Sequence, residues 1–521
     1  MTSSQKIRWR PAAVIVLLDI IFVAWTWLSQ AVMRQQQVLN TFYSQGVTVL
    51  LLLVWLLFFS KLIWKKRMAF LATFIFALLL FTSLFRFKEF SGDIAPIFEV
   101  RWKSESQQTS NRGPTPEITE EPSQLNSPNA PNYHYPQFLG PDRNGKIKGI
   151  KLNRDWENNP PKLIWRQPIG EGWSSFAIVG KHAITQEQDG EYELVVSYDL
   201  TTGRVNWRHR DKTRYATVLA GVGPRATPTI DKDRVYSLGA TGVLNCLLLS
   251  TGEPVWSKNI LKENDAAAKS WGQSCSPFVL DSLVIVSAGG IRQRSLVSYH
   301  KLTGDPVWSS GDDPAGYSSP MSAELGGIQQ VLIFNKGHVV AHAPVDGRVL
   351  WKYPWPKNTE EVAQPVILPH NRVLITTGYG IGSKLLEINP TENGGLSPTL
   401  LWENNRLKAK FTNVVYHDGY IYGLDDGILV CLDSTDGKRM WKRGRFGHGQ
   451  ILLADDLLII QAESGEVALV AASPDSFQEL SRFPAIEGKT WNNPALAGPY
   501  LLVRNSQEAA CYRLTLRSSS I

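Results

Sequence analysis

The sequence predicts an all-β protein, an eight-bladed β-propeller, preceded by three transmembrane α-helices. The propeller is indicated by tryptophans that recur at roughly 40 to 52 residues, the length of a four-stranded blade. These structural blade tryptophans are Trp165, Trp207, Trp256, Trp308, Trp351, Trp402 and Trp441. The helices are indicated by three long apolar runs near the N-terminus, each close to the ~20 residues that cross a bilayer.

A glycine stands four residues before five of the tryptophans, as Gly252 does before Trp256. We expect this glycine to supply a positive φ angle in the outer turn of each blade. The tryptophan then lies on the outermost strand, where its flat ring can fill the wedge between neighbouring blades. Scattered core tryptophans would not keep this fixed spacing, so a repeated unit is the better interpretation.

Short runs rich in Val, Ile, Leu and Tyr alternate with Gly, Asp and Asn turns, as strands joined by hairpins should. In the second blade the expected strands are 226–230, 234–238, 243–249 and 254–258. Seven blades run from about residue 173 to about 483. The seventh departs from the pattern, with Phe477 in place of the glycine and Ser481 in place of the tryptophan. The fifth carries an insertion at 392–398.

The two ends of the repeat region each lack part of a blade. A lone outer strand is expected at Lys162–Arg166, and three strands without an outer strand are expected at 491–514. Joining them gives a shared eighth blade, which removes free sheet edges.

The repeats resemble pyrroloquinoline-quinone (PQQ)-type repeats, found in eight-bladed quinoprotein alcohol dehydrogenases and in BamB-type outer-membrane-protein assembly lipoproteins. The segment Tyr135–Gly145 is similar to one that precedes the propeller in many bacterial PQQ-like repeat proteins. Gly223–Pro228 and Ser274–Pro277 resemble blade openings of that group. The resemblance covers 133–516 and implies the fold more than the chemistry, because the repeat serves both enzymes and scaffolds.

The membrane anchor is assigned to residues 1–103, with spans at about 12–33, 46–64 and 68–85. A cleaved signal peptide is the alternative for the first span, but two more spans follow it. Basic residues precede the first span and separate the second from the third. They place the N-terminus in the cytoplasm and the propeller in the periplasm of a bacterial inner membrane. Residues 104–132 are rich in Ser, Pro, Asn, Gln and Glu, which predicts a disordered linker to the propeller domain at 133–516.

Residues just before the first strand of each blade should line the entrance of the central channel. We predict a ligand-binding funnel made of Trp173, Ser175, Arg225, Thr227, Trp271, Ser274, Ser276, Ser319, Gln364, Asn413, His448, Gln450, Trp491 and Asn492. Such a ring could hydrogen-bond a planar anion, stack an indole on it and neutralise it with Arg225. The alternative is that small polar residues cap the channel strands and hold water.

The resemblance leaves enzyme and scaffold open. A PQQ dehydrogenase needs the quinone, a Ca²⁺ ion and a carboxylate base, and the family's alcohol dehydrogenases carry adjacent cysteines. This chain has no adjacent cysteines. The nearest carboxylates are Glu171 and Glu361, and we expect neither to be paired with a second carboxylate at the site. The chain's four cysteines make no disulfide framework; Cys275 is the candidate reactive thiol.

We therefore expect no catalytic residues, no metal site and no cofactor. PQQ with calcium is the one cofactor that the resemblance leaves open. A net charge of +7 without a basic, aromatic-interleaved stripe argues against nucleic-acid binding. The predicted function is a membrane-tethered module that binds a protein or peptide partner, or a small ligand, in the envelope. The alternatives are a PQQ-dependent oxidoreductase and a BamB-like assembly factor.

Overall fold

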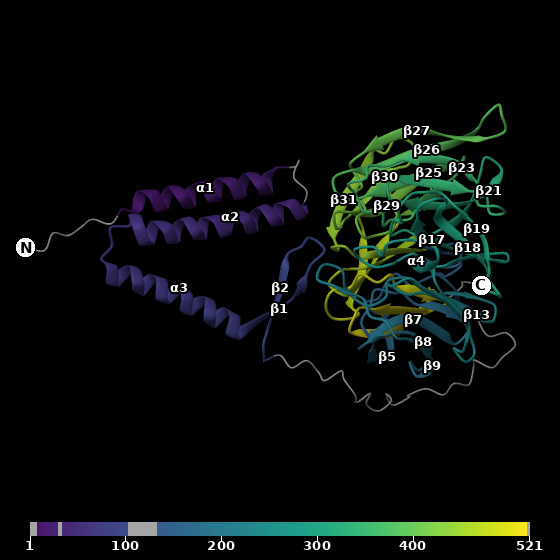
Figure 1. Cartoon of the computed structure of the whole chain (residues 1–521), viewed down its shortest axis with the longest axis horizontal. Coiled ribbons are helices and arrows are strands. Elements are labelled where there is room, and N and C mark those ends of the chain that lie inside the picture. Colours follow the sequence, from purple (N-terminus) through teal and green to yellow (C-terminus); the bar gives the residue numbers. More distant parts are fainter. Residues whose placement is uncertain (1–7, 30–33, 103–132, 518–521) are drawn as a thin grey trace, which may run out of the picture. The chain divides into compact units, whose positions relative to one another are not determined.

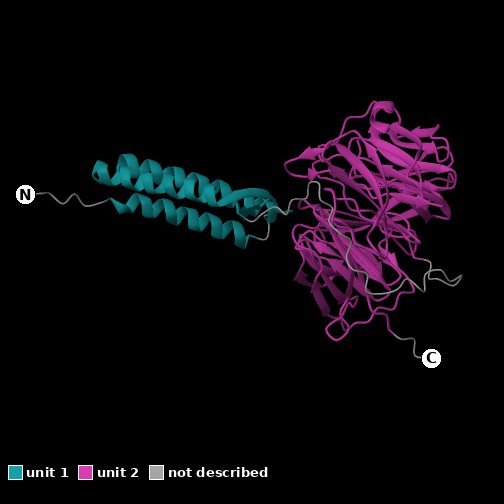
Figure 2. Ribbon diagram, turned by 90° about the horizontal axis from the view of Figure 1, so that it is seen from below, with its two compact units in different colours: residues 1–113 teal, residues 114–521 magenta. Residues whose placement is uncertain are grey.

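The computed structural model describes residues 8–29, 34–102 and 133–517. The chain forms two compact units, Met1–Gly113 and Pro114–Ile521 (Figure 2). The linker expected at 104–132 lies outside the described residues, so that prediction stays open.

The first unit consists of three long helices and a β-hairpin (Figure 1). Its elements are α1 (Trp9–Leu28), α2 (Arg34–Val54) with a π-helical turn η1 (Trp55–Phe59), α3 (Trp64–Leu84), β1 (Phe85–Phe90) and β2 (Pro96–Val100). All three helices are long and apolar enough to cross a membrane.

The second helix begins at Arg34, whereas the sequence placed the span at 46–64 and a loop before it. The polar residues before Gly46 extend this helix because they contact α1 along its length. The Gln37 side chain donates to the Thr26 carbonyl (3.1 Å), and the Trp27 indole donates to Thr41 Oγ1 (3.0 Å). The helix therefore continues past the apolar run, because neighbouring side chains satisfy its polar face.

The second unit is a ring of eight β-sheets, the predicted propeller (Figure 1). Blades one to four comprise β6 (Ala177–Val179), β7 (His182–Asp189), β8 (Tyr192–Asp199) and β9 (Val205–Asp211); β12 (Thr229–Asp231), β13 (Arg234–Leu238), β14 (Val243–Leu248) and β15 (Pro254–Asn259); β16 (Phe278–Leu280), β17 (Leu283–Gly290), β18 (Arg294–His300) and β19 (Pro306–Ser310); β20 (Met321–Leu325), β21 (Ile328–Asn335), β22 (His338–His342) and β23 (Val349–Pro354). The strands predicted for the second blade match within three residues at each end.

Blades five to seven continue the same order. They comprise β24 (Val366–Leu368), β25 (Arg372–Thr377), β26 (Gly382–Pro390) and β27 (Leu396–Asn404); β28 (Val415–His417), β29 (Tyr420–Asp425), β30 (Ile428–Asp433) and β31 (Arg439–Arg445); β32 (Gln450–Ala454), β33 (Leu457–Gln461), β34 (Glu466–Ala471) and β35 (Glu479–Pro484). Outside the blades lie a short helix, α4 (Ile260–Glu263), and a small hairpin of β10 (Ala216–Thr217) and β11 (Gly221–Val222).

The eighth blade joins the two ends of the propeller, as predicted. Three C-terminal strands, β36 (Ala495–Ala497), β37 (Tyr500–Arg504) and β38 (Glu508–Arg513), take β5 (Lys162–Pro168) as their outer strand. The buried Arg504 joins this blade to the first one, because its guanidinium donates to Thr185 Oγ1 (2.6 Å) and to the Gln186 carbonyl (2.9 Å).

The repeated glycine contacts the tryptophan of the preceding blade rather than its own. Gly252 has a φ of +74°, and a Cβ there would lie 2.3 Å from the Trp207 ring. The Trp207 indole also donates to the Leu249 carbonyl (2.7 Å) in the same turn. Glycine is thus required for both its conformation and the room it leaves, and one repeat motif binds two blades together.

The seventh blade keeps this wedge filled with other residues. Phe477 packs against Trp441 with ring centroids 5.8 Å apart. Ser481, which replaces the outer-strand tryptophan, accepts a hydrogen bond from the Trp156 amide (3.1 Å). The buried Trp156, which comes from the segment before β5, packs on Phe483 at 5.6 Å. A tryptophan from outside the repeats therefore supplies the missing ring.

Residues 133–147 form a plug segment that enters the central channel where the inner strands end. Its first strand, β3 (His134–Tyr135), pairs with β6 of blade one, and its last, β4 (Lys146–Ile147), pairs with β32 of blade seven. Between them, Arg143 donates to the carbonyls of Ser276 (3.0 Å) and Pro277 (3.1 Å) in blade three. The Tyr135 hydroxyl reaches the Pro494 carbonyl of blade eight (3.3 Å).

Candidate functional site: the channel mouth

The predicted polar funnel residues are brought together, and most of them bond neighbouring blades to one another. Successive backbone amides donate to the side chain of the next blade: Ser175 to Thr227 Oγ1 (3.1 Å), Thr227 to Ser276 Oγ (2.9 Å), Ser276 to Ser319 Oγ (2.9 Å), Ser319 to Gln364 Oε1 (2.8 Å) and Gln364 to Asn413 Oδ1 (3.0 Å). The Gln364 side-chain amide is oriented so that its oxygen accepts from the Ser319 amide and its nitrogen donates to the Ser319 carbonyl (2.7 Å).

Gln450 and Asn492 close this polar ring. Gln450 begins β32 of blade seven. Its side-chain amide donates to the carbonyls of Phe411 (2.8 Å), before blade six, and of Trp491 (3.0 Å), before blade eight. Asn492 donates to the Ser174 carbonyl of blade one (2.8 Å). Five backbone amides and three carbonyls near the starts of inner strands thus find partners in adjacent blades. These side chains cap the channel strands, which is the structural alternative that the sequence left open; their ligand-binding role stays a prediction.

Above the polar ring, aromatic side chains from different blades meet at the mouth. This aromatic cluster consists of Trp173, Trp271, Tyr317, Phe411 and Trp491. Ring centroids are 4.9 Å apart for Trp173 and Trp491, 5.4 Å for Phe411 and Trp491, 5.7 Å for Trp271 and Phe411, and 5.0 Å for Trp271 and Tyr317.

The Trp271–Phe411 contact spans the mouth, because blades three and six lie nearly opposite each other in an eight-membered ring. Both rings are half-buried, so each keeps part of its surface open to solvent. The mouth is therefore a shallow aromatic surface. At the other end of the channel the plug segment contacts blades eight and three through Tyr135 and Arg143.

Cations lie over these rings. Lys489 Nζ is 4.4 Å from the Trp491 centroid and 5.2 Å from that of Trp173. Lys269 Nζ is 4.2 Å from Tyr317, and Lys410 Nζ is 4.9 Å from Phe411. Cation–π attraction places the ammonium groups beside the aromatic surface. The mouth thus offers aromatic faces and positive charge together.

The remaining predicted site residues hold this surface in place. Arg225 donates to the carbonyls of Ala220 and Gly221, both at 3.0 Å, and its guanidinium lies 4.7 Å from the Tyr215 ring. It therefore fixes the loop on which the Trp173 indole also rests, through a 2.6 Å bond to the Ala220 carbonyl. Burial lowers the pKa of Arg225 to about 10.

Ser274 and His448 belong to this lining as well. Ser274 donates to the Tyr317 carbonyl (2.8 Å), and the His448 ring lies 5.3 Å from Phe411.

With Glu193, Glu361 is one of the two carboxyl groups in the described propeller whose pKa is strongly raised. It is fully buried, and burial raises its pKa to about 7, opposed in part by Lys336 and Lys269. One carboxylate oxygen accepts from Thr359 Oγ1 (3.0 Å). By contrast Glu171 is exposed as a residue, and partial desolvation of its carboxyl group raises its pKa, opposed by Arg214. The two predicted carboxylates are not brought into contact with one another by any described hydrogen bond.

We expect Glu361→Gln to stabilise the protein above neutral pH. Because the folded pKa exceeds the ordinary value of 4.5, the folded state binds the proton more tightly, and stability falls as pH rises from 4.5 to about 7. Relative to the wild type, E361Q should gain on the order of 1–3 kcal/mol at pH 8 and little at pH 4.5. Urea unfolding at both pH values measures this; an equal effect at both would contradict the assignment.

A centre of PQQ and calcium would need metal ligands and open space at this mouth. Within the described ranges no three His, Cys, Asp or Glu side chains are grouped as metal ligands would be. The space above the polar ring is taken by the contact of Trp271 with Phe411. Cys275 is buried, and burial raises its pKa to about 11, which opposes thiolate formation. These residues do not fit a calcium–quinone centre, and whether PQQ binds stays a prediction.

Sequence reasoning missed Phe411, Lys410, Lys489 and Tyr317 at the mouth. Lys410 and Phe411 lie two to three residues before the predicted Asn413, just as Lys489 precedes the predicted Trp491 by two residues. A basic residue close to an aromatic one before an inner strand was therefore the available signal.

The propeller was compared with known proteins. The sequence profile of the family described as outer membrane protein assembly factor BamB matches residues 155–270 and 191–443. These matches together span more than half of the chain. The chain belongs to this PQQ-like family. No curated protein matches the sequence.

Solved structures of this PQQ-like family's fold are similar to the chain at low identity. The quinohemoprotein alcohol dehydrogenase of Comamonas testosteroni is 13% identical, with a TM-score of 0.53 over 78% of this chain and 83% of the other. The computationally designed Ika8 protein is 12% identical, with a TM-score of 0.51 over 68% and 99%. BamB of Moraxella catarrhalis is 13% identical, with a TM-score of 0.49 over 69% and 99%. At these identities the likeness shows the fold alone.

Proposed function

We propose that this PQQ-like protein is a membrane-anchored binding module whose channel mouth holds an envelope protein or peptide. The observation that carries the proposal is the closure of the channel. The aromatic cluster spans one end, and the plug segment crosses the other with contacts to blades three and seven. What remains is a shallow surface of half-buried rings, Trp173, Trp271, Phe411 and Trp491, with the half-buried Lys269 and Lys489 beside them. Such a surface suits a polypeptide better than a deeply enclosed cofactor.

The family description supports an envelope role, since the matching profile is named for outer membrane protein assembly. The three apolar helices support an integral membrane position, and the basic residues beside them favour a periplasmic propeller. A BamB-like assembly role is the finer form of this proposal, in which mouth residues contact a protein partner.

A photocrosslinking amino acid in place of Trp271 tests the mouth as the binding surface in cells. Lys232, in an exposed turn between β12 and β13, gives the matched control position. We expect adducts to one envelope protein from position 271 and none from position 232. Equal adducts at both positions would show that the mouth is not the binding surface.

A quinoprotein function is tested on the purified full-length protein. It is incubated with PQQ and Ca²⁺, passed through a desalting column and examined by absorbance and metal analysis. We expect no quinone to remain with the protein. Retention of one PQQ per chain would make the oxidoreductase the better proposal.

Topology gives a further prediction, because it decides the compartment of the mouth. Alkaline phosphatase or green fluorescent protein fused at about residue 110 reports the side of the membrane directly. Retention of basic clusters in the cytoplasm predicts an active phosphatase and a dark fluorescent protein. The reverse result would place the propeller in the cytoplasm and end the envelope proposal.

A further inference from the structure

Asp19 lies at the middle of α1, in a helix apolar enough to cross a membrane. No other acidic residue occurs in the three candidate spans Trp9–Leu28, Arg34–Phe59 and Trp64–Leu84. Their basic residues all stand in the first turn of a helix, as Arg10 and Arg34 do. An ionisable side chain inside a membrane is costly and almost always has a functional partner.

The neighbouring helix supplies donors to this carboxylate. Gln45 Nε2 donates to Asp19 Oδ2 (2.8 Å), and the Ser44 hydroxyl donates to Oδ1. The helices run antiparallel, since Thr26 contacts Gln37 at one end of the pair and the Arg8 carbonyl accepts from Trp55 at the other. The carboxylate is thus held at a fixed height on the α1–α2 hairpin.

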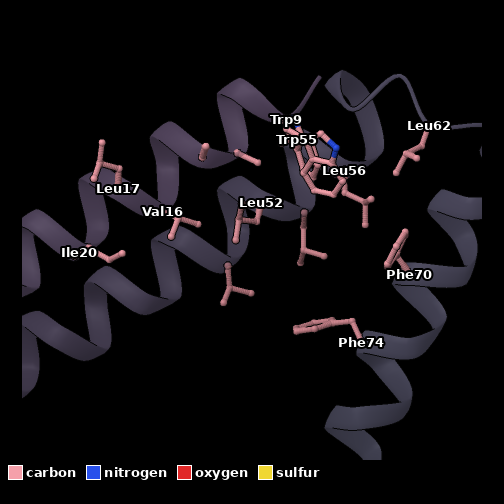
Figure 3. A pocket seen from close by; sticks show the side chains of 14 residues that line it. Trp9, Val16, Leu17, Ile20, Leu52, Trp55, Leu56, Leu62, Phe70 and Phe74 are labelled. Carbon is pink, nitrogen blue, oxygen red and sulfur yellow. The ribbon is translucent and has the colours of Figure 1, made fainter. Parts of the chain in front are cut away.

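The hairpin has two faces of different chemistry. Toward α3 it is apolar: Val16, Ile20 and Leu52 face Phe70 and Phe74 across a hydrophobic pocket (Figure 3).

Its other face carries a groove of about 400 Å³ that none of the α3 residues lines. This polar groove contains Asp19, Asn40, Tyr43, Ser44 and Thr48 among apolar residues. Tyr43 is 71% exposed, so no other segment of the helical unit covers this side chain. Its polar side chains stand among Leu18, Phe22, Val47 and Leu51, and at membrane depth a protein partner satisfies them better than lipid chains do.

We propose that the polar groove docks a transmembrane helix of a partner protein that carries a basic side chain near its centre. This inference rests on the membrane anchor of the proposed function. Charge complementarity identifies the occupant, because Asp19 has no cation at its level in the described helices. A second copy of this chain would bring another Asp19 and no mid-span base, so like charges would meet.

The test uses the full-length protein, labelled with a fluorophore and reconstituted in phosphatidylcholine vesicles. Labelled transmembrane peptides of Leu and Ala with a central Lys, Leu or Glu serve as probes, and energy transfer measures association. We expect the Lys peptide to bind about tenfold more tightly than the Leu peptide. Asp19→Asn should remove this preference, while Thr73→Val on α3, outside the groove, should keep it.

Equal binding of the Lys and Leu peptides would overturn the proposal. Energy transfer between two copies of the protein would also overturn the proposal if D19N abolished it. That result would identify a second copy as the occupant of the groove. Carbonate extraction of the vesicles is measured first. If carbonate extracts the protein from the vesicles, the membrane anchor of the proposed function is refuted. If the protein stays inserted but shows no preference for the Lys peptide, only the docking proposal is refuted.

Discussion

Removal of residues 491–521 is expected to leave the propeller open and prone to aggregation. The deletion takes β36, β37 and β38 from the eighth blade and leaves β5 without its only partner in the described sheet. It also removes part of the largest hydrophobic cluster, in which Leu501, Leu502 and Cys511 are buried beside Trp165. Exposed edges and exposed apolar surface both promote association between chains.

Solubility in detergent and limited proteolysis measure this outcome. Deletion of residues 518–521 is the matched control, because β38 ends at Arg513 and stays intact. A truncated chain as soluble and protease-resistant as the control would mean that seven blades close on their own.

Arg504→Met is expected to cost the protein about 3–5 kcal/mol of unfolding free energy. The guanidinium is buried, which lowers its pKa, and it also donates to the Gly170 carbonyl (3.0 Å). Nearby, the buried Glu187 accepts from the Gly170 amide (2.7 Å) and from the Tyr198 hydroxyl (2.5 Å). Methionine would leave the carbonyls and a buried carboxylate without their cation.

Urea unfolding of the purified protein measures the loss. Arg513→Met on the exposed end of β38 removes the same side chain without a buried contact, and should change stability by less than about 0.5 kcal/mol. Equal effects of the two variants would show that Arg504 does not hold the first and eighth blades together.

The repeats were predictable because each blade encodes its own signal. The strand runs, the glycine turn and the tryptophan lie within one unit, so the blades and the shared eighth blade follow from local spacing. The cross-blade role of Gly252 did not follow, because its partner, Trp207, lies in the preceding repeat. Trp156 was missed for the same reason, since it fills a gap left by Ser481, far along the chain.

The candidate site was predictable in position but not in detail. Residues before the inner strands do gather at the mouth. The hydroxyl groups of Thr227 and Ser276, however, accept hydrogen bonds from backbone amides of adjacent blades. Which side chain faces a neighbour and which faces solvent depends on the tilt of each blade. The sequence pattern does not contain that tilt. Phe411 could be placed only once blade six was seen opposite Trp271.

The plug segment also sets where a mechanical load enters the propeller. Any tension on the chain from the side of the helices reaches residue 133 first, and the backbone there is bonded to the inner strand of blade one. Farther along, Arg143 is tied to blade three and β4 to blade seven. These attachments follow one another along the chain, and β5, the outer strand of the eighth blade, comes after all of them. A pull therefore loads the plug segment before it reaches the strand that closes the ring.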